Sequence, residues 1–271
     1  KMNLAENNPW LWNSRWTHLL LRDVSTGTGD SSDKMEPTFL GAKSKDDIMR
    51  QVEVLKQANI NAILTEGVRH LINYERDGKT DEVIEAIRMA TKICHRAGIK
   101  IIHHTTTTFA GHKVNEFPEA LQAWLSIDVQ TGKPSFINWE GGWHLWCINN
   151  PGFRAEYFRL CKKVLAETGV DGLMTDEVYF RANGWYTCTC PHCREKYRLA
   201  SGRSLPPADD ASFWGHFDNE AFRAWLRVRA ASVGDFYADL RAEINKVHPH
   251  PVFLGCSNHE EDPAQTSMFG D

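Results

Sequence analysis

The sequence predicts an α/β protein of the (β/α)8 TIM-barrel type, and three observations carry this prediction. Short apolar segments alternate with amphipathic helical segments along the 271 residues, which is typical of a parallel sheet. No G-x-G-x-x-G follows the first predicted strand, which weakens the doubly wound dinucleotide-binding alternative. Polar residues collect where strands are expected to end, which is where barrel enzymes place their chemistry. They are Arg22-Asp23, Glu66, His103-His104, Asp176-Glu177 and Ser257-Asn258.

The predicted elements follow one another with no hairpin signals between them. Ser44 and Asn150 are residue types that cap helices, and Pro151 suits the first helical turn after Asn150. Helices are expected to end near Gly98 and Gly169. The expected strands cover residues 16–23, 61–66, 100–109, 171–178 and 251–258. The expected helices begin near residues 44, 80, 150, 191 and 219, and the last ends near 247.

The strand count bears on domain organisation. About five strand–helix units are visible, whereas a closed barrel needs eight. We therefore expect residues 1–271 to form a single barrel-type domain that is the front part of a longer polypeptide. A smaller complete α/β fold is the alternative.

Composition and charge indicate an ordinary globular protein. Hydrophobic residues make up 42% and charged residues 24% of the chain, which is enough for a sizeable core. The formal net charge is -4, and the absence of a basic stripe argues against nucleic acid as a partner. No apolar run approaches the length of a membrane span. The first residues contain no apolar signal core, so we expect a soluble protein, cytoplasmic or secreted after signal removal, with a homo-oligomer left open.

Three cysteines follow the fourth predicted strand in a C-x-C-x-x-C pattern. They are Cys188, Cys190 and Cys193. Sulfurs at this spacing can reach one tetrahedral ion, and a structural zinc site closes with four ligands. Cys147 is the preferred fourth ligand, because in a barrel its loop lies beside the loop that carries the other three; His192 and Cys256 are alternatives. The metal-free interpretation is three reduced cysteines, or one disulfide and a spare thiol.

The region around these cysteines resembles a known family. D-G-L-M-T-D-E-V before the C-x-C-x-x-C, with C-I-N-N-P-G-F-R further upstream, resembles the barrel domain of the glycoside hydrolase family 42 β-galactosidases. It is also similar to uncharacterised glycoside hydrolases of the α-amylase-like superfamily. The resemblance covers residues 140–200 well and the rest only as strand–helix order. It implies that Glu177 is the general acid/base and that the C-x-C-x-x-C cysteines bind zinc, with Cys147 a looser match.

The sequence also departs from that family. Asp176 stands where the family has Asn, and the family's nucleophile, a glutamate on a late strand, is absent from these 271 residues. Other barrel glycosidases use an Asp at the end of strand four as nucleophile, which Asp176 could resemble. Neighbouring residues on a strand point to opposite faces, so Asp176 and Glu177 are not expected to form the catalytic pair together. Glu66 and Asp23 are the candidates for a second carboxylate.

Polar and aromatic residues near these carboxylates are the candidates for substrate binding. Tryptophan rings stack on the apolar faces of sugars, and three tryptophans lie close together at 139, 143 and 146. A zinc-bound loop after Glu177 would hold its neighbours in a fixed geometry, as such catalysis requires. The predicted substrate-binding residues are Arg22, Glu66, His104, Trp143, Tyr179 and Trp185.

The main hypothesis is therefore a glycoside hydrolase with carboxylate acid/base chemistry, a carbohydrate substrate and structural zinc. A catalytically silent carbohydrate-binding barrel is the first alternative. A metal-dependent hydrolase using His103 and His104 is the second, although no H-x-H on the first strand supports it.

Overall fold

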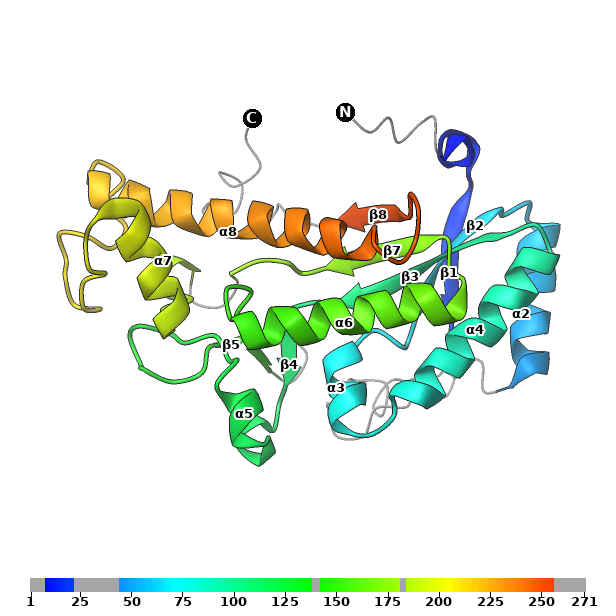
Figure 1. Ribbon diagram of the computed structural model, residues 1–271, viewed down its shortest axis with the longest axis horizontal. Helices are drawn as coiled ribbons and strands as arrows, with labels where there is room; N and C mark the ends of the chain where they lie inside the picture. Colours follow the sequence, from blue (N-terminus) through cyan, green and yellow to red (C-terminus); the bar gives the residue numbers. More distant parts are fainter. Residues whose placement is uncertain (1–7, 22–43, 138–141, 181–183, 256–271) are drawn as a thin grey trace.

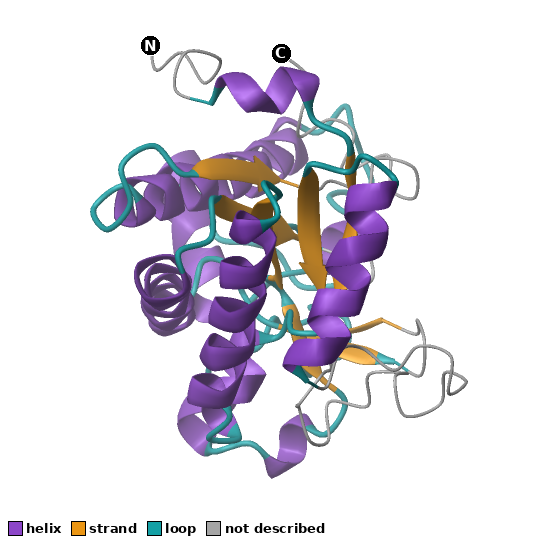
Figure 2. Ribbon diagram, turned by 90° about the vertical axis from the view of Figure 1, so that its right-hand side faces the viewer, coloured by secondary structure: helices purple, strands orange, loops and turns teal. Residues whose placement is uncertain are grey.

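The computed structural model describes residues 8–21, 44–137, 142–180 and 184–255. Its centre is a parallel five-stranded sheet (Figure 1). The strands are β1 (Trp16–Leu20), β2 (Ala62–Glu66), β3 (Lys100–Thr106), β7 (Gly172–Asp176) and β8 (Val252–Gly255). Their order in the sheet is their order in the chain, and they fan out with a twist (Figure 2). The five predicted strands are thus confirmed, and within the described residues the sheet is open, with β1 and β8 at its edges.

Four long helices connect successive strands. Each packs against the next, α2 on α4, α4 on α6, and α6 on α8, and α6 and α8 run side by side along the molecule (Figure 1). They are α2 (Lys45–Gln57), α4 (Thr80–Arg96), α6 (Pro151–Thr168) and α8 (Glu220–Ile244). The shorter helical segments are η1 (Pro9–Asn13), α3 (Leu71–Arg76), η4 (Val114–Glu116), α5 (Glu119–Gln122), η5 (Gly184–Tyr186) and α7 (Pro191–Ser201).

The predicted helix caps are present. The Ser44 side chain accepts a hydrogen bond from the Asp47 backbone at the start of α2. The Asn150 side chain accepts hydrogen bonds from Gly152 and Phe153 at the start of α6. Each cap satisfies amide donors that have no partner within the helix. No helix in the described part of the chain has the length and apolar character needed to cross a membrane.

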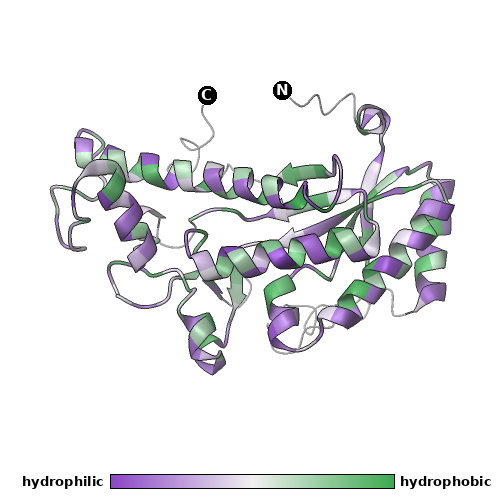
Figure 3. Ribbon diagram, viewed as in Figure 1, coloured by the Kyte–Doolittle hydropathy of each residue, from purple (hydrophilic) through white to green (hydrophobic). Residues whose placement is uncertain are grey.

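The two faces of the sheet differ in what covers them. Leu19, Ile63 and Leu173 are completely buried in the core that the helices share. Hydrophobic residues alternate with hydrophilic ones along these helices (Figure 3), as expected when one helix face packs on a core. On the opposite face, the His18 side chain is 53% exposed and Leu20 is 37% exposed. The face away from the helices is therefore the more accessible one at β1, although Ile102 and His104 on the same face of β3 are buried.

A second sheet was not expected from the sequence. Strands β4 (Phe109–Gly111), β6 (Trp143–Leu145) and β5 (Phe136–Ile137) form an antiparallel sheet in the order β4-β6-β5. It lies beside α5 and the start of α6 (Figure 1). The predicted strand 100–109 is therefore too long, because β3 ends at Thr106 and Phe109 belongs to the second sheet. Strands of two or three residues are too short to show an alternating pattern.

Candidate active site and metal centre

Three of the predicted site residues converge at the carboxyl ends of neighbouring strands. His104 on β3 lies between Glu66 on β2 and Asp176 on β7. Its Nδ1 is 2.6 Å from Glu66 Oε1, and its Nε2 is 3.2 Å from Asp176 Oδ2. Strand register explains the meeting: His104 pairs with Met174, so Asp176, two residues beyond Met174, projects from the same face. This is the accessible face of the sheet.

Charges around His104 and Glu66 reinforce one another. Burial by itself would lower the pKa of His104, but the hydrogen bonds to Asp176 and Glu66 raise it above the ordinary value. Burial would raise the pKa of Glu66, but the hydrogen bond and charge of His104, with the charges of Arg69 and His18, lower it. Arg69 Nε is 3.4 Å from Glu66 Oε2. The array therefore favours a protonated imidazole between ionised carboxylates.

The same contacts bear on the predicted roles of Glu66 and His104. Both residues were expected to bind substrate. Both ring nitrogens of His104 face carboxylate oxygens, and its side chain is 6% exposed. Their observed polar contacts are thus made within the protein.

Glu177 occupies a different environment from Asp176. It follows the last residue of β7 with a left-handed backbone, φ 62°, so the alternation expected for a continuous strand stops at Asp176. Glu177 is buried, whereas Asp176 has intermediate exposure. The backbone at Glu177 is fixed by Thr108, whose Oγ1 donates a hydrogen bond to the Glu177 carbonyl at 2.6 Å. Of the two acids, Asp176 is the more accessible.

The remaining predicted substrate-binding residues lie in several places. Tyr179 is 5% exposed, and Trp185 is half-buried against Phe222. Trp143 is 3% exposed and belongs to the core of the small sheet; its ring stacks on that of His70 at 5.4 Å. Trp143 thus has a packing role in the described structure, and its contact with sugar stays a prediction. Arg22, Trp139 and the strand-end residues 23, 257 and 258 lie outside the described residues.

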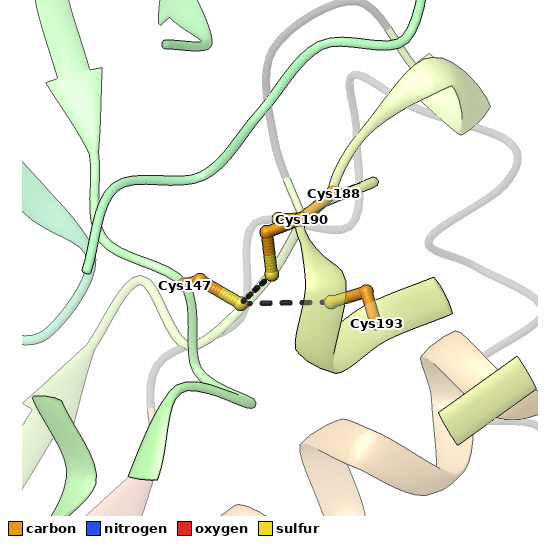
Figure 4. Close-up of side chains that lie close together, drawn as sticks. All are labelled: Cys147, Cys188, Cys190 and Cys193. Carbon is orange, nitrogen blue, oxygen red and sulfur yellow. Dashed lines mark hydrogen bonds between the residues drawn. The ribbon is translucent and has the colours of Figure 1, made fainter. Parts of the chain in front are cut away.

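The four predicted metal ligands form one compact group. Cys147, Cys188, Cys190 and Cys193 are all buried, and their sulfur atoms lie within 4.8 Å of one another (Figure 4). Cys147 Sγ is 3.5 Å from Cys193 Sγ and 3.4 Å from Cys190 Sγ. Zn–S bonds of about 2.3 Å in a tetrahedron place sulfurs about 3.8 Å apart. The group can therefore hold a metal ion, and all four cysteines are free of disulfides.

Surrounding donors suit thiolate ligands. The Ile127 backbone N–H donates to Cys188 Sγ at 3.3 Å, and Asn149 Nδ2 donates to Cys193 Sγ at 3.3 Å. Hydrogen bonds to the sulfurs from outside the ligand set are typical of metal sites, because they orient the ligands and favour their charged form. Of the two alternative fourth ligands, His192 is exposed and Cys256 lies outside the described residues. Cys147 is thus the fourth cysteine of this group, and its role as a metal ligand stays a prediction.

The segment between Glu177 and the cysteines is anchored from α8. Arg229 is 1% exposed and its Nη2 donates to the carbonyls of Phe180 and Gly184, at 2.9 and 3.0 Å. Trp225 Nε1 donates to the Trp185 carbonyl at 2.8 Å. Anchors in the middle and a cysteine group at the end hold this segment against the helical layer.

His103 and His104 do not form a metal site together in the described structure. They project from opposite faces of β3. His103 is completely buried, with Nδ1 2.8 Å from Thr65 Oγ1. In the part of the chain that the structure describes, the four cysteines are the group of three or more His, Cys, Asp or Glu residues whose ligand atoms converge. This arrangement gives no support to the metal-dependent hydrolase.

Three residues that contact the candidate site or its loop were not identified from the sequence. Arg69 lies three residues after Glu66, a spacing that signals nothing outside a helix. Asn149 directly precedes Asn150, the predicted helix cap, and no separate pattern marked it. Arg229 had a usable signal: it falls on the buried stripe of α8 with Phe222, Trp225 and Phe236, where a charge needs a specific partner.

Comparisons with known proteins agree with this fold. No protein-family profile matches the chain, and neither does any curated protein sequence. Solved structures do match. The α-L-fucosidase isoenzyme 2 from Paenibacillus thiaminolyticus is 18% identical, with a TM-score of 0.54, over 94% of this chain and 34% of the fucosidase. The α-N-acetylgalactosaminidase from Bifidobacterium bifidum is 14% identical, with a TM-score of 0.52, over 93% and 36% of the two chains.

A third match is the α-amylase from Anoxybacillus, 14% identical with a TM-score of 0.51, over 96% of this chain and 49% of the amylase. The chain thus spans between a third and a half of these proteins. At these identities the likeness concerns the fold alone: a mixed α/β arrangement around a parallel sheet, shared with parts of these glycoside hydrolases.

Proposed function

We propose that this chain carries the acid/base site of a glycoside hydrolase, within a (β/α)8 barrel that further βα units complete. The observation that supports it best is the Asp176 carboxylate, on the accessible face of the sheet and 3.2 Å from His104 Nε2. In a (β/α)8 barrel the strands of the sheet follow one another in chain order and the helices cover one face. The same arrangement is seen in this sheet. Barrel enzymes act at the carboxyl ends of their strands, where Asp176 lies.

In this proposal the two adjacent acids have separate roles. Glycoside hydrolysis needs one carboxyl group that donates a proton and one carboxylate that acts as nucleophile or base. A buried carboxyl group favours its neutral form, so the more buried Glu177 is the proton donor. The expectation that the two acids point to opposite faces rested on strand alternation, which the left-handed backbone at Glu177 ends. Asp176, hydrogen-bonded to His104, is therefore one candidate for the anionic role. A carboxylate from a strand outside the described residues is the other candidate for the anionic role.

The metal in this proposal is zinc, held by Cys147, Cys188, Cys190 and Cys193. Four thiolates close the coordination shell, so the ion would leave no position for water or substrate and its role is structural. It would fix the end of the segment whose other end carries Glu177. Loop placement of this kind is what oriented catalysis depends on.

The experiment is an activity screen on aryl glycosides, run beside sugar-binding calorimetry and elemental analysis. Galactosides follow from the family resemblance, and fucosides and N-acetylgalactosaminides from the names of the structural neighbours. Hydrolysis of any of them, lost in Asp176→Asn, supports the proposal. Sugar binding without hydrolysis supports the carbohydrate-binding alternative. Absence of zinc from protein purified without chelator contradicts the metal assignment.

A further inference from the structure

The array of Glu66, His104 and Asp176 has a chemical consequence for protonation. A carboxylate accepts hydrogen bonds and donates none, whereas a neutral imidazole has one donor nitrogen and one acceptor nitrogen. His104 faces Glu66 Oε1 at Nδ1, at 2.6 Å, and Asp176 Oδ2 at Nε2, at 3.2 Å. Only the imidazolium donates at both nitrogens, so it satisfies both carboxylates at once.

The neighbouring charges are consistent with that state. Around Glu66 lie Arg69, whose Nε is 3.4 Å from Oε2, and His18, whose Nε2 is 3.6 Å from Oε1. On the helix-covered face, His103 is buried and neutral, since burial lowers its pKa to about 3. Two carboxylates, one imidazolium and one guanidinium leave the array without net charge. Removing one member of such an array would leave an uncompensated charge in a partly buried site, which is costly.

We propose that His104, oriented by Glu66, is a positioning residue that holds the Asp176 carboxylate in place as an anion. The inference rests on the proposed glycosidase function and deepens it. Glu66 has no direct contact with Asp176 in this scheme and acts through the His104 ring. In other catalytic sites a buried carboxylate orients an imidazole by binding the ring nitrogen that faces away from the reacting group. Glu66 would fix the orientation of the His104 ring in the same way.

The first arm of the test is independent of any substrate. Long-range ¹H–¹⁵N NMR of the histidine rings reports whether one or both nitrogens carry a proton. For His104 we expect a titration midpoint above the ordinary value of 6.5, with both nitrogens protonated below that midpoint. In Glu66→Gln the midpoint should fall by about 1–3 pH units, the effect of removing an adjacent opposite charge. His95→Gln is the matched control. His95, in the last turn of α4, also pairs with an acid, Asp171, at 2.9 Å, but Asp171 directly precedes β7 and so lies at the opposite end of the sheet.

The second arm measures kcat and KM against pH for the same variants on a glycoside that the wild type hydrolyses. The inference predicts that Glu66→Gln lowers kcat more than it changes KM. It also predicts that the alkaline limb of the kcat profile moves to lower pH with the His104 midpoint, while His95→Gln moves neither. Glu66→Asp, which retains the carboxylate, should restore the limb in part.

Each outcome decides something. A His104 midpoint at or below 6.5, or a midpoint that Glu66→Gln leaves unmoved, overturns the array. An unchanged pH profile in an active Glu66→Gln enzyme overturns the positioning role. Hydrolysis of no glycoside by the wild type, with the imidazolium present, removes the proposed function and with it the catalytic role of the array.

Discussion

The pH dependence of stability alone can test whether His103 on β3 is a buried core residue. The side chain has no exposed surface and lies on the helix-covered face. Burial, with a smaller contribution from the charge of His104, lowers the pKa of His103 from 6.5 to about 3. The folded protein therefore holds this ring neutral at a pH where the unfolded chain protonates it.

The size of the effect follows from that interval. The pKa of His103 is lower in the folded than in the unfolded state. The stability that comes from keeping its ring neutral is therefore fully present above pH 6.5 and is lost as the pH falls toward 3. At about 1.36 kcal/mol per pH unit, the interval from 6.5 to about 3 corresponds to about 5 kcal/mol at most. Between pH 7 and pH 4.5 the loss is about 2.5 kcal/mol.

Urea unfolding at these two pH values measures it. His103→Asn cannot titrate and keeps a group that can hydrogen-bond to Thr65. We expect the wild type to lose about 2.5 kcal/mol more than this variant between pH 7 and pH 4.5. His192→Asn, at an exposed position, is the control and should follow the wild type. Equal losses in the wild type and His103→Asn would refute the reasoning and reopen a functional role for His103.

Three further predictions concern the cysteine group, Asp171 just before β7, and the segment that Arg229 anchors. Cys188→Ser should lose the bound metal and lower Tm, whereas Cys94→Ala, a buried thiol outside the group, should keep the metal; elemental analysis and a thermal scan measure both. Asp171→Asn should lower the free energy of unfolding by about 1–3 kcal/mol at pH 7. That difference should disappear as the pH falls below 3.8, because His95 and Lys100 outweigh burial and lower the pKa of Asp171. Arg229→Met removes the donor from one buried carbonyl, that of Phe180, and from one partly buried carbonyl, that of Gly184. Urea unfolding should show a cost of about 1–3 kcal/mol for the buried carbonyl and less for the other.

The sequence supported those features that depend on local pattern. Ser44 and Asn150 are polar residues placed directly before apolar helical stretches, so their caps were predictable. C-x-C-x-x-C fixes three sulfurs by spacing, and the barrel-type chain order brought Cys147 to them. These features need only a short segment or the order of elements.

The features that the sequence did not reveal depend on exact register and on local backbone geometry. His103 and His104 are neighbours in sequence, but pairing with Leu173 and Met174 sends one into the core and the other to the carboxylates. Nothing in H-H indicates which is which. The left-handed backbone at Glu177 likewise ends the alternation that the strand pattern implied, because a positive φ is set by the fold around it.

Measuring the dependence of hydrolysis on the leaving group in Glu177→Gln and Asp176→Asn tests the central claim most directly. We expect Glu177→Gln to slow a substrate with a poor leaving group by about two to four orders of magnitude, because the proton donor is lost. An activated aryl glycoside, whose leaving group needs little protonation, should be slowed much less. Asp176→Asn should slow both substrates. If Glu177→Gln leaves both rates unchanged while the protein keeps its fold and metal, Glu177 is not the general acid, and the account of the site is contradicted.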